Sequence, residues 1–510
     1  MKSLLKVLRS HLTDVKRLLP EVRGLERDLF TLEARCRCEG YGFLTVALSN
    51  LGKDLDRGLA DGFLSSTHGF SMVGQIPKLF QGIYREIFDS DTGALKGEAS
   101  PEYVKVLRET LYLFKKLVPT THRDSKLDEL ARASFFKCDQ EIRDLNPFLL
   151  SRVESVSKFV LPDLEQIQDF EPKHGPGAVF EGCTPNQKWS EVYKAIVCED
   201  SRLQEIGFDL PMALHNHSPT LVDHPPSQVV RLVTVPKNST SKRTITVEPV
   251  LNQFVQQAYN GALRDSILLC PILQRCLTLS DQRPNQKLAR IGSIKGTWCT
   301  IDLSLASDRL SEQLVRSVFA NHPRFLTGLT ACRTPMVQCG DLHFPISKYA
   351  GMGNATTFPV QSVAFAIIAI TAIVASKPKK FTYQDLRSAA RNIRVFGDDI
   401  VVRSEYFRPV CDWLTNLGLK INRGKTFSTG NFRESCGKDY FRGHDVTPIY
   451  LRHEPGNISN RPSAFAGLIS TCNQLWLQGR YSCATTIQNY LGSLPLVHES
   501  CSGLGYHTRM

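Results

Sequence analysis

The chain has 510 residues, enough for one large protein of several subdomains or for two to four ordinary domains, and 42% of them are hydrophobic. Its 62 lysines and arginines exceed the 50 acidic residues and give a formal charge of +12, which favours a polyanionic partner, nucleic acid before an anionic membrane. The fifteen cysteines include no CxxC pair, so neither a zinc knuckle nor a thioredoxin motif is supported, and we expect free, mostly buried thiols.

The first 160 or so residues predict mainly helices with charged faces. At the N-terminus, five apolar residues recur at helical spacing among lysines and arginines: Leu4, Leu8, Leu12, Val15 and Leu19. This pattern predicts a basic amphipathic helix and lacks the uninterrupted apolar stretch of a secretory signal. We expect its apolar face to pack on the protein's own body, with a partner or a membrane surface as the alternative.

Three segments resemble ligand sites only in part. KHGPGAVFEG (Lys173–Gly182) is rich in glycine and could hold a phosphate, but it lacks the Walker pattern. GLKINRGKT ends like a Walker loop, but Leu419 stands where that pattern requires glycine. A third set of residues resembles metal ligands but lies in a proline-rich loop without regular spacing, which disfavours zinc: His215, His217, Asp223 and His224.

Residues 229–247 predict two β-strands joined by a short basic connection, because VVRLVTV leads into PKNS and β-branched residues follow. Lys237, Lys242 and Arg243 crowd this connection, and the hairpin contains no acidic residue. Two paired strands can hold such cations in place. A solvated surface loop is the alternative interpretation.

TWCTIDLSLASDRLSEQLV (Thr297–Val315) predicts a strand that ends near Asp302, followed by a loop and a helix. Asp308 is the expected N-cap of that helix, because aspartate side chains accept hydrogen bonds from the first free backbone N–H groups. Four apolar residues define the buried face of the helix: Leu310, Leu314, Val315 and Val318. Asp302 is therefore expected at the carboxyl end of a strand, where a site can open.

RVFGDDIVVR (Arg394–Arg403) predicts a hairpin with a tight turn at Gly397-Asp398. Adjacent carboxylates at roughly 4 Å repel each other by about 1 kcal/mol in water and about 4 kcal/mol in a half-buried site. An isolated Asp-Asp pair in a turn is often only structural. Together with Asp302, however, Asp398 and Asp399 form a set of hard oxygen ligands that suits Mg²⁺ with open positions for water and substrate phosphates. The combination predicts a two-metal nucleotidyl-transfer site.

Between these segments lies GMGNATTFPVQSVAF (Gly351–Phe365). Gly351 and Gly353 would allow the backbone to approach a template or nucleotide closely. The polar side chains that follow are suited to a ribose 2′-hydroxyl: Asn354, Thr356, Thr357, Gln361 and Ser362.

The most apolar run, Val363–Ala375, has thirteen residues, fewer than the ~20 that a membrane-spanning helix needs. Pro359 lies near its start and Pro378 just past its end, and both are typical of helix boundaries. The run predicts a buried helix and no membrane span.

The order and spacing of these motifs resemble those of viral RNA-dependent RNA polymerases, with Phe396-Gly397-Asp398-Asp399 as the GDD signature. Over roughly residues 173–455 the chain is similar to the replicase catalytic subunit of the small RNA bacteriophages, the leviviruses. That closer similarity rests on GPGA near residue 176, on VPKNSTSKRTITVEP and on GKTFSTGNFRESCGKDYFRGHDVTPIYLRH.

The resemblance implies an α+β right-hand fold with an antiparallel, RRM-like palm sheet and largely helical fingers and thumb. Its implied parts are an N-terminal helical region or fingers (1–160), fingers with the cationic hairpin (161–290), the palm (291–455, with a fingers insertion at about 320–348) and a small thumb (456–510).

The resemblance also implies roles for single residues. Asp302 and Asp398 would bridge two Mg²⁺ ions, for which Mn²⁺ can substitute, with Asp399 assisting and Lys425 giving a proton to pyrophosphate; a surface lysine is the alternative for Lys425. The implied NTP-binding residues are Lys237, Lys242, Arg243, Asp308, Asn354 and Thr357. The implied RNA-binding residues are Gly351, Gly353 and Arg442.

The implied partners are template and product RNA, NTPs and host proteins, namely translation elongation factors and a ribosomal protein, in the cytoplasm of a bacterial host cell. Many such polymerases carry asparagine where this chain has Gln361. Two alternatives stay open: a reverse transcriptase, which usually has alanine in place of Gly397, and a non-catalytic RNA-binding protein or translational repressor.

Overall fold

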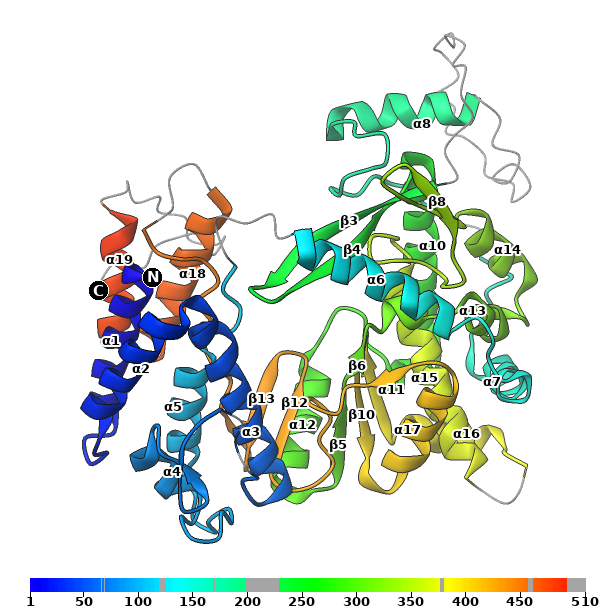
Figure 1. Ribbon diagram of the computed structural model, residues 1–510. Helices are drawn as coiled ribbons and strands as arrows, with labels where there is room; N and C mark the ends of the chain where they lie inside the picture. Colours follow the sequence, from blue (N-terminus) through cyan, green and yellow to red (C-terminus); the bar gives the residue numbers. More distant parts are fainter. Residues whose placement is uncertain are drawn as a thin grey trace.

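The computed structural model describes residues 1–65, 67, 69–118, 125–167, 170–197, 229–376, 380–456 and 462–492, and it combines helices with several small sheets (Figure 1). Two large apolar cores hold it together, one built from residues 4–117 with 427–491 and the other from residues 145–419. The α+β class is therefore confirmed. The domain boundaries stay predictions, but the N-terminal helices share their core with the C-terminal ones.

Helices make up most of the first core, as the sequence predicts. They are α1 (Lys2–Leu18), α2 (Leu25–Glu39), α3 (Leu48–Asp61), α4 (Gln81–Ile87) and α5 (Pro101–Tyr112), with α18 (Pro462–Leu477) and α19 (Tyr481–Leu491). A π-helical turn (Phe43–Ala47) precedes α3, and β1 (Met72–Val73) pairs with β2 (Ile76–Pro77).

The basic N-terminal helix packs on the body of the protein, as expected. All five apolar residues of its stripe are buried. The carboxylate of Asp14 accepts hydrogen bonds from the backbone N–H groups of Ser482 (3.0 Å) and Cys483 (2.8 Å), which fixes α1 against the start of α19. The cysteines are free throughout the described residues and most of them are buried, which confirms the prediction from their spacing.

The predicted basic hairpin is confirmed as β3 (Val229–Asn238) and β4 (Ser241–Val247), which pair in antiparallel register with an irregularity between Pro236 and Asn238. On its other side β3 pairs in parallel with β7 (Met336–Cys339), and β7 pairs with β8 (Leu342–Pro345). Helix α6 (Ser125–Glu141) contacts this four-stranded sheet over a small apolar core. The chain between residues 147 and 331 also contains the helices α7 (Pro147–Val160), α8 (Lys188–Val197), α10 (Val250–Leu269), α11 (Leu273–Cys276), α13 (Glu312–Phe319) and α14 (Pro323–Ala331).

The central sheet has the strand order β5–β10–β9 and is antiparallel, with β5 (Trp298–Ile301), β10 (Asp399–Arg403) and β9 (Ile393–Phe396). Beside it lie a second sheet of β12 (Phe432–Ser435), β13 (Lys438–Phe441) and β14 (His444–Asp445), and the pair β6 (Leu303–Ser304) with β11 (Lys420–Ile421). Helix α12 (Arg283–Lys295) contacts strands of both sheets. Helices α16 (Tyr383–Ala390) and α17 (Phe407–Asn416) complete this region.

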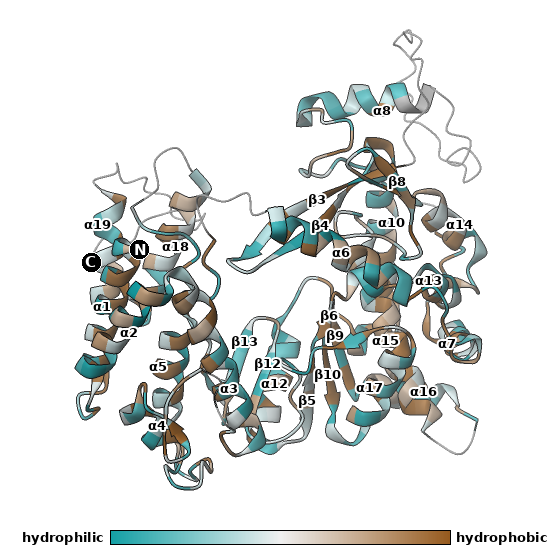
Figure 2. Cartoon of the chain, in the orientation of Figure 1, coloured by the Kyte–Doolittle hydropathy of each residue, from teal (hydrophilic) through white to brown (hydrophobic). Residues whose placement is uncertain are grey.

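Helix α15 (Thr357–Ala375) passes through the second core and packs on β9. It is the one helix of the described residues whose length and composition would suit a membrane span, but 89% of its apolar window is buried inside the protein. Figure 2 accordingly shows α15, β9 and β10 as largely hydrophobic and α8 as largely hydrophilic. The predicted buried helix is confirmed, and it begins six residues earlier than the apolar run.

The predicted N-cap at Asp308 is wrong. Asp308 lies in a short 3-10 turn, and α13 begins at Glu312 after Ser311, whose Oγ accepts a hydrogen bond of 3.2 Å from the backbone N–H of Gln313. The apolar face was predicted correctly, since Leu314, Val315 and Val318 are all buried, although Leu310 precedes the helix.

Candidate active site

Asp302 and Asp399 stand at the same end of two neighbouring strands. The last residue of β5, Ile301, is opposite Ile400 of β10, so the next pair in this register is Asp302 and Asp399. Directly opposed residues of antiparallel strands have Cβ atoms about 4.5–5.5 Å apart. The expectation that acids from distant parts of the chain converge is therefore met by the strand pairing.

The turn that carries Asp398 is held in place by α15. Phe396 pairs with Asp399, so the predicted turn is confirmed, and Gly397 has a φ of 61°. A Cβ on Gly397 would lie 2.9 Å from the ring of Phe358. The backbone N–H of Gly397 donates a hydrogen bond of 3.1 Å to Ser362 Oγ, and Asp398 itself is exposed at the tip.

Asp302 is held by the loop after β11. Asn422 Nδ2 donates a hydrogen bond of 2.6 Å to the Asp302 carboxylate, and the backbone N–H of Asp302 donates to Thr426 Oγ1 at 3.2 Å. Burial raises the pKa of Asp302 to about 6; Lys425 and Asn422 oppose the rise, whereas Glu434 and Asp398 add to it. Asp302 thus lies within the electrostatic field of the turn.

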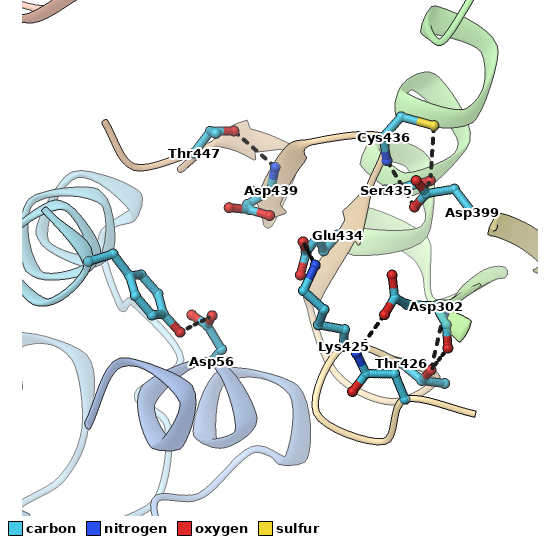
Figure 3. A network of polar contacts seen from close by, with 12 residues as sticks. Asp56, Asp302, Asp399, Lys425, Thr426, Glu434, Ser435, Cys436, Asp439 and Thr447 are labelled. Atoms are coloured by element: carbon cyan, nitrogen blue, oxygen red, sulfur yellow. Dashed lines mark hydrogen bonds and ion pairs between the residues drawn. The ribbon is translucent and has the colours of Figure 1, made fainter. Parts of the chain in front are cut away.

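Asp399 faces the hairpin that joins β12 to β13 (Figure 3). Its carboxylate accepts hydrogen bonds from the backbone N–H of Cys436 (3.0 Å) and from Ser435 Oγ (3.4 Å). Burial raises the pKa of Asp399 to about 7, and the negative charges of Asp398, Asp302 and Glu434 add to this effect against the hydrogen bond from Cys436. The negative charges of Asp302, Asp398 and Glu434 therefore all reach Asp399, and we call these four residues the acid cluster.

Glu434 is a member of this cluster that sequence reasoning missed. Lys425 Nζ donates a hydrogen bond of 2.8 Å to Glu434 Oε1, as Figure 3 shows. Burial alone would lower the pKa of the Lys425 ammonium, but the charges of Glu434 and Asp302 outweigh it and raise that pKa. Lys425 is thus a cation held beside the acids, which agrees better with a role in the site than with a free surface lysine.

The carboxylates fit divalent cations that keep open positions. Among the described residues, no three Asp, Glu, His or Cys side chains converge closely enough to enclose one ion. Mg²⁺ suits such an incomplete set, because it retains waters and accepts substrate phosphates as ligands. The mutual repulsion of Asp302, Asp398 and Asp399 is the observation that fits a bound cation, and these three residues would hold it.

Lys237, in the β3–β4 hairpin, lies within the electrostatic field of Asp302 and Asp398. Burial, Arg243 and Lys425 lower the pKa of the Lys237 ammonium, and the charges of Asp302 and Asp398 partly restore it. Arg243, opposite Val235 in the hairpin, is exposed. The charges of Asp302 and Asp398 therefore reach Lys237, and the second hairpin cation, Arg243, lies close enough to Lys237 to lower its pKa.

Lys242 is directed at helix α6. Its Nζ forms an ion pair of 2.7 Å with Asp128 of α6, and its side chain is only 12% exposed. Thr234 Oγ1 donates to the same carboxylate. This contact fastens the hairpin to α6, so Lys242 meets a nucleotide only if the ion pair opens.

The two loop glycines lie against β4. The backbone N–H of Thr246 donates a hydrogen bond of 2.8 Å to the carbonyl of Met352. A Cβ on Gly353, whose φ is 134°, would lie 1.9 Å from the Thr246 carbonyl oxygen, and one on Gly351 would lie 2.4 Å from the Thr246 side chain. The close approach that these glycines permit is to the cationic hairpin; their contact with RNA stays a prediction.

The polar residues after the glycines mostly bond within their own loop. Asn354 Oδ1 accepts hydrogen bonds from the N–H (2.8 Å) and the hydroxyl (2.6 Å) of Thr356, and Thr357 Oγ1 donates to the Gly351 carbonyl at 3.1 Å. Asn354 Nδ2 and Gln361 Oε1 are buried and have no partner within the described parts of the chain. Each of these two groups therefore keeps an unused hydrogen-bonding atom.

Asp308 is buried in an ion pair of 3.2 Å with Lys348 Nζ, which also lies over the ring of Phe135 at 3.3 Å from its centroid. Arg442 is likewise engaged: its guanidinium donates to the carbonyls of Gly97 (2.7 Å), Ala99 (3.1 Å) and Lys96 (2.9 Å). Both residues connect parts of the fold in this structure, and their predicted contacts with NTP and RNA remain predictions.

The partial ligand motifs have structural explanations where they are described. The buried Lys188 Nζ donates to the carbonyls of Gly175 and Gly177 at 2.6 Å each, so the glycine-rich segment folds around a lysine of its own chain. The cluster of His215, His217, Asp223 and His224 lies outside the described residues.

Residues 221–476 match the family model described as RNA replicase, beta-chain. The chain is 36% identical over 273 residues to the RNA-directed RNA polymerase subunit beta of Enterobacteria phage SP. The matched segment covers 52% of this chain and 43% of that protein. It is 37% identical over 226 residues to the same subunit of Escherichia virus Qbeta, covering 44% and 35% respectively. The chain thus spans less than half the length of these curated relatives.

Among solved structures, the RNA-dependent RNA polymerase of a human picorbirnavirus is similar with a TM-score of 0.47 and 11% identity, over 74% of this chain and 77% of that one.

Proposed function

Because the chain belongs to the RNA replicase beta-chain family, we propose that it is an RNA-dependent RNA polymerase that copies the genome of a positive-strand RNA phage. The observation that carries the proposal is the register of β5 and β10, which brings Asp302 beside Asp399, next to the turn with Asp398. A non-catalytic RNA-binding protein would not need these acids to meet, nor Lys237 to lie within their electrostatic field.

The proposed arrangement is a right hand. Its palm is the β5–β10–β9 sheet with α15 and α17, and its fingers include the β3–β4–β7–β8 sheet, in which residues 336–345 join the cationic hairpin. Its thumb is α18 with α19. The core shared by residues 4–117 and 427–491 supports grouping the N-terminal helices with the thumb rather than with the fingers.

In the proposed reaction, the triphosphate of an incoming NTP lies against Lys237 and Arg243. Asp302, Asp398 and Asp399 would hold two Mg²⁺ ions, or Mn²⁺ in their place, and these ions would supply charge stabilisation and a more acidic 3′-hydroxyl. The 3′-hydroxyl of the growing strand loses its proton to water and attacks the α-phosphorus in line. The bond from that phosphorus to the bridging oxygen breaks, and Lys425 gives a proton to the departing pyrophosphate. Catalysis of this kind is mainly positioning and charge stabilisation.

Template RNA, product RNA and NTPs are the proposed ligands, and the cytoplasm of a bacterial host is the proposed location. The curated relatives are named as a subunit beta, which supports an assembly with further subunits. We propose host translation elongation factors and a ribosomal protein as those subunits.

The test is RNA synthesis by the purified chain on a single-stranded RNA template with Mg²⁺, with and without a primer and with added host extract. We expect ribonucleotides to be incorporated in preference to deoxyribonucleotides. A preference for deoxyribonucleotides would favour a reverse transcriptase. RNA binding without synthesis under all these conditions would favour a binding protein.

A further inference from the structure

A second group of basic side chains lies beside the candidate site, at the end of α5. Two backbone hydrogen bonds align the segment after α5 with residues 451–452: Leu451 N–H donates to the Leu113 carbonyl (2.7 Å), and Val118 N–H donates to the Arg452 carbonyl (3.0 Å). This pairing brings Lys115, Lys116 and Arg452 together from positions far apart in the sequence.

The two lysines have fixed positions. Lys115 Nζ lies 4.1 Å from the centroid of the Tyr112 ring, and Lys116 Nζ lies 3.9 Å from that of Tyr450. Tyr112 is itself anchored, because its hydroxyl donates a hydrogen bond of 2.7 Å to the buried carboxylate of Asp56. Ammonium groups over aromatic rings gain some attraction but keep donors free for a further ligand.

Within the described residues, neither lysine nor Arg452 forms an ion pair. The carboxylates whose charges act on these lysines are Asp56 and Glu434. Both already have a cation: Asp56 forms an ion pair of 2.7 Å with Arg108, and Glu434 forms one with Lys425. Burial, Arg452, Lys115 and Lys425 together lower the pKa of Lys116 to about 8. Three cations are thus gathered where the protein offers them no carboxylate of their own, and a bound anion would relieve their repulsion.

We propose that Lys115, Lys116 and Arg452 bind phosphate groups of the RNA strand that is being extended. The inference rests on the proposed polymerase function. Its location supports it, because Lys116 lies in the electrostatic field of both Lys425 and Glu434, which belong to the acid cluster. Figure 1 shows α5 to the left of β12 and β13, and the β3–β4 hairpin above these strands.

One phosphate chemistry has two sources here: the backbone of a primed strand, and the triphosphate of the first nucleotide when synthesis starts without a primer. The first source, the RNA backbone, is tested by a binding experiment without NTPs. We measure how the affinity of the purified chain for an RNA duplex depends on salt concentration, using a duplex whose recessed end lacks the 3′-hydroxyl. The variant K115Q/K116Q keeps most of each side-chain stem and removes two charges.

Loss of two phosphate contacts should make the slope of log affinity against log salt shallower by about 1.4 to 1.8. K115R/K116R, which keeps the charges, should retain the wild-type slope. K78Q/K96Q removes two exposed lysines of the same N-terminal region and is the matched control. Should K115Q/K116Q fail to fold, the exposed Arg452→Gln should still make the slope shallower by about 0.7 to 0.9.

The first-nucleotide source is tested by the apparent KM of the initiating NTP in unprimed synthesis. A several-fold higher KM in K115Q/K116Q, with an unchanged KM for later nucleotides, would assign the triphosphate as the ligand. A folded K115Q/K116Q with wild-type salt slope and wild-type initiation would overturn the inference. The binding test does not depend on RNA synthesis, because the duplex cannot be extended. If the chain makes no RNA, the proposed function is contradicted, but the result of the binding test still holds.

Discussion

Lys425 and Glu434 form an ion pair of 2.8 Å at the edge of the acid cluster, between the loop after β11 and strand β12. The pair fixes the ammonium group near Asp302 without an ion pair to Asp302 itself. Glu434 is therefore expected to act through Lys425, by keeping its proton donor in position.

Replacing Glu434 by Gln should slow nucleotide incorporation about 10-fold or more while leaving the apparent KM for NTP nearly unchanged, since a general acid typically contributes 10²–10⁴-fold. Lys425→Ala should have the same kind of effect. If Glu434 acts through Lys425, the double variant should be no slower than Lys425→Ala alone, because residues that act as a unit are not additive. Single-turnover rates of the three variants decide this, and fully multiplicative effects would contradict it.

Asp398→Asn should abolish RNA synthesis while RNA binding persists. The change keeps the size of the side chain at the exposed tip of the turn but removes a charge that the proposed cations need. The measurements are incorporation of labelled NTP and affinity for template RNA. Asp412→Asn, in α17, is the control substitution at an acid outside the cluster, and incorporation near the wild-type level by Asp398→Asn would refute the assignment.

The hairpin offers a matched pair of substitutions. Arg243→Ala should raise the apparent KM for NTP, because the exposed guanidinium is available to a triphosphate. Lys242→Ala should instead lower stability, because it leaves Asp128 without its ion pair and loosens α6. Steady-state kinetics and thermal unfolding of both variants separate the roles. An unchanged KM in Arg243→Ala would return this residue to the solvated-loop interpretation.

Local sequence was enough to predict both hairpins and the strand before Asp302. The Gly397-Asp398 turn has its own chemistry, and the β-branched arms on each side of it pair with each other, so no distant contact was needed. The meeting of Asp302 with Asp399 was inferred only because the residue types matched a known chemistry. The strand order β5–β10–β9 that produces it was not predicted.

The wrong and missing predictions concern residues whose environment is decided by contacts with residues far away in the sequence. Asp308 and Ser311 are both good N-cap residues. Asp308 instead forms a buried ion pair with Lys348, which lies forty positions further on in the sequence. Glu434 is a single acid in a short strand, with no spacing signal to link it to Lys425. Arg442 looked free in the sequence, but it bonds carbonyls more than three hundred positions earlier.

Arg108 should be among the most costly residues to replace. It is 2% exposed and bonds Asp56 and Asp439 at once, at 2.7 and 2.9 Å, so it ties α5 and α3 to β13. Arg108→Met leaves two buried carboxylates without their cation, which should destabilise the fold by about 3–5 kcal/mol. Arg316→Ala, whose ion pair with Glu312 is half exposed, should cost only about 0–1 kcal/mol. Urea unfolding of both variants tests the contrast, and similar losses would contradict it.

The acid cluster should make stability depend on pH and on divalent cations together. The pKa values of Asp302 (about 6) and Asp399 (about 7) are raised above their ordinary values near 4. A raised pKa in the folded state means that protonation favours folding. Without divalent cations, this contribution should be fully present below about pH 4 and should be lost as the pH rises through 6 to 7.

Mg²⁺ should therefore raise the melting temperature more at pH 8 than at pH 5, because at the lower pH it must displace protons from the carboxyl groups. Buried Glu248, whose pKa burial raises to about 7, adds its own pH dependence but lies outside the cluster. The variant D302N/D399N isolates the cluster: it should lose the Mg²⁺ effect and keep the contribution of Glu248. Thermal unfolding at both pH values, with and without Mg²⁺, measures this. An equal Mg²⁺ shift in wild type and variant would show that the cations bind elsewhere.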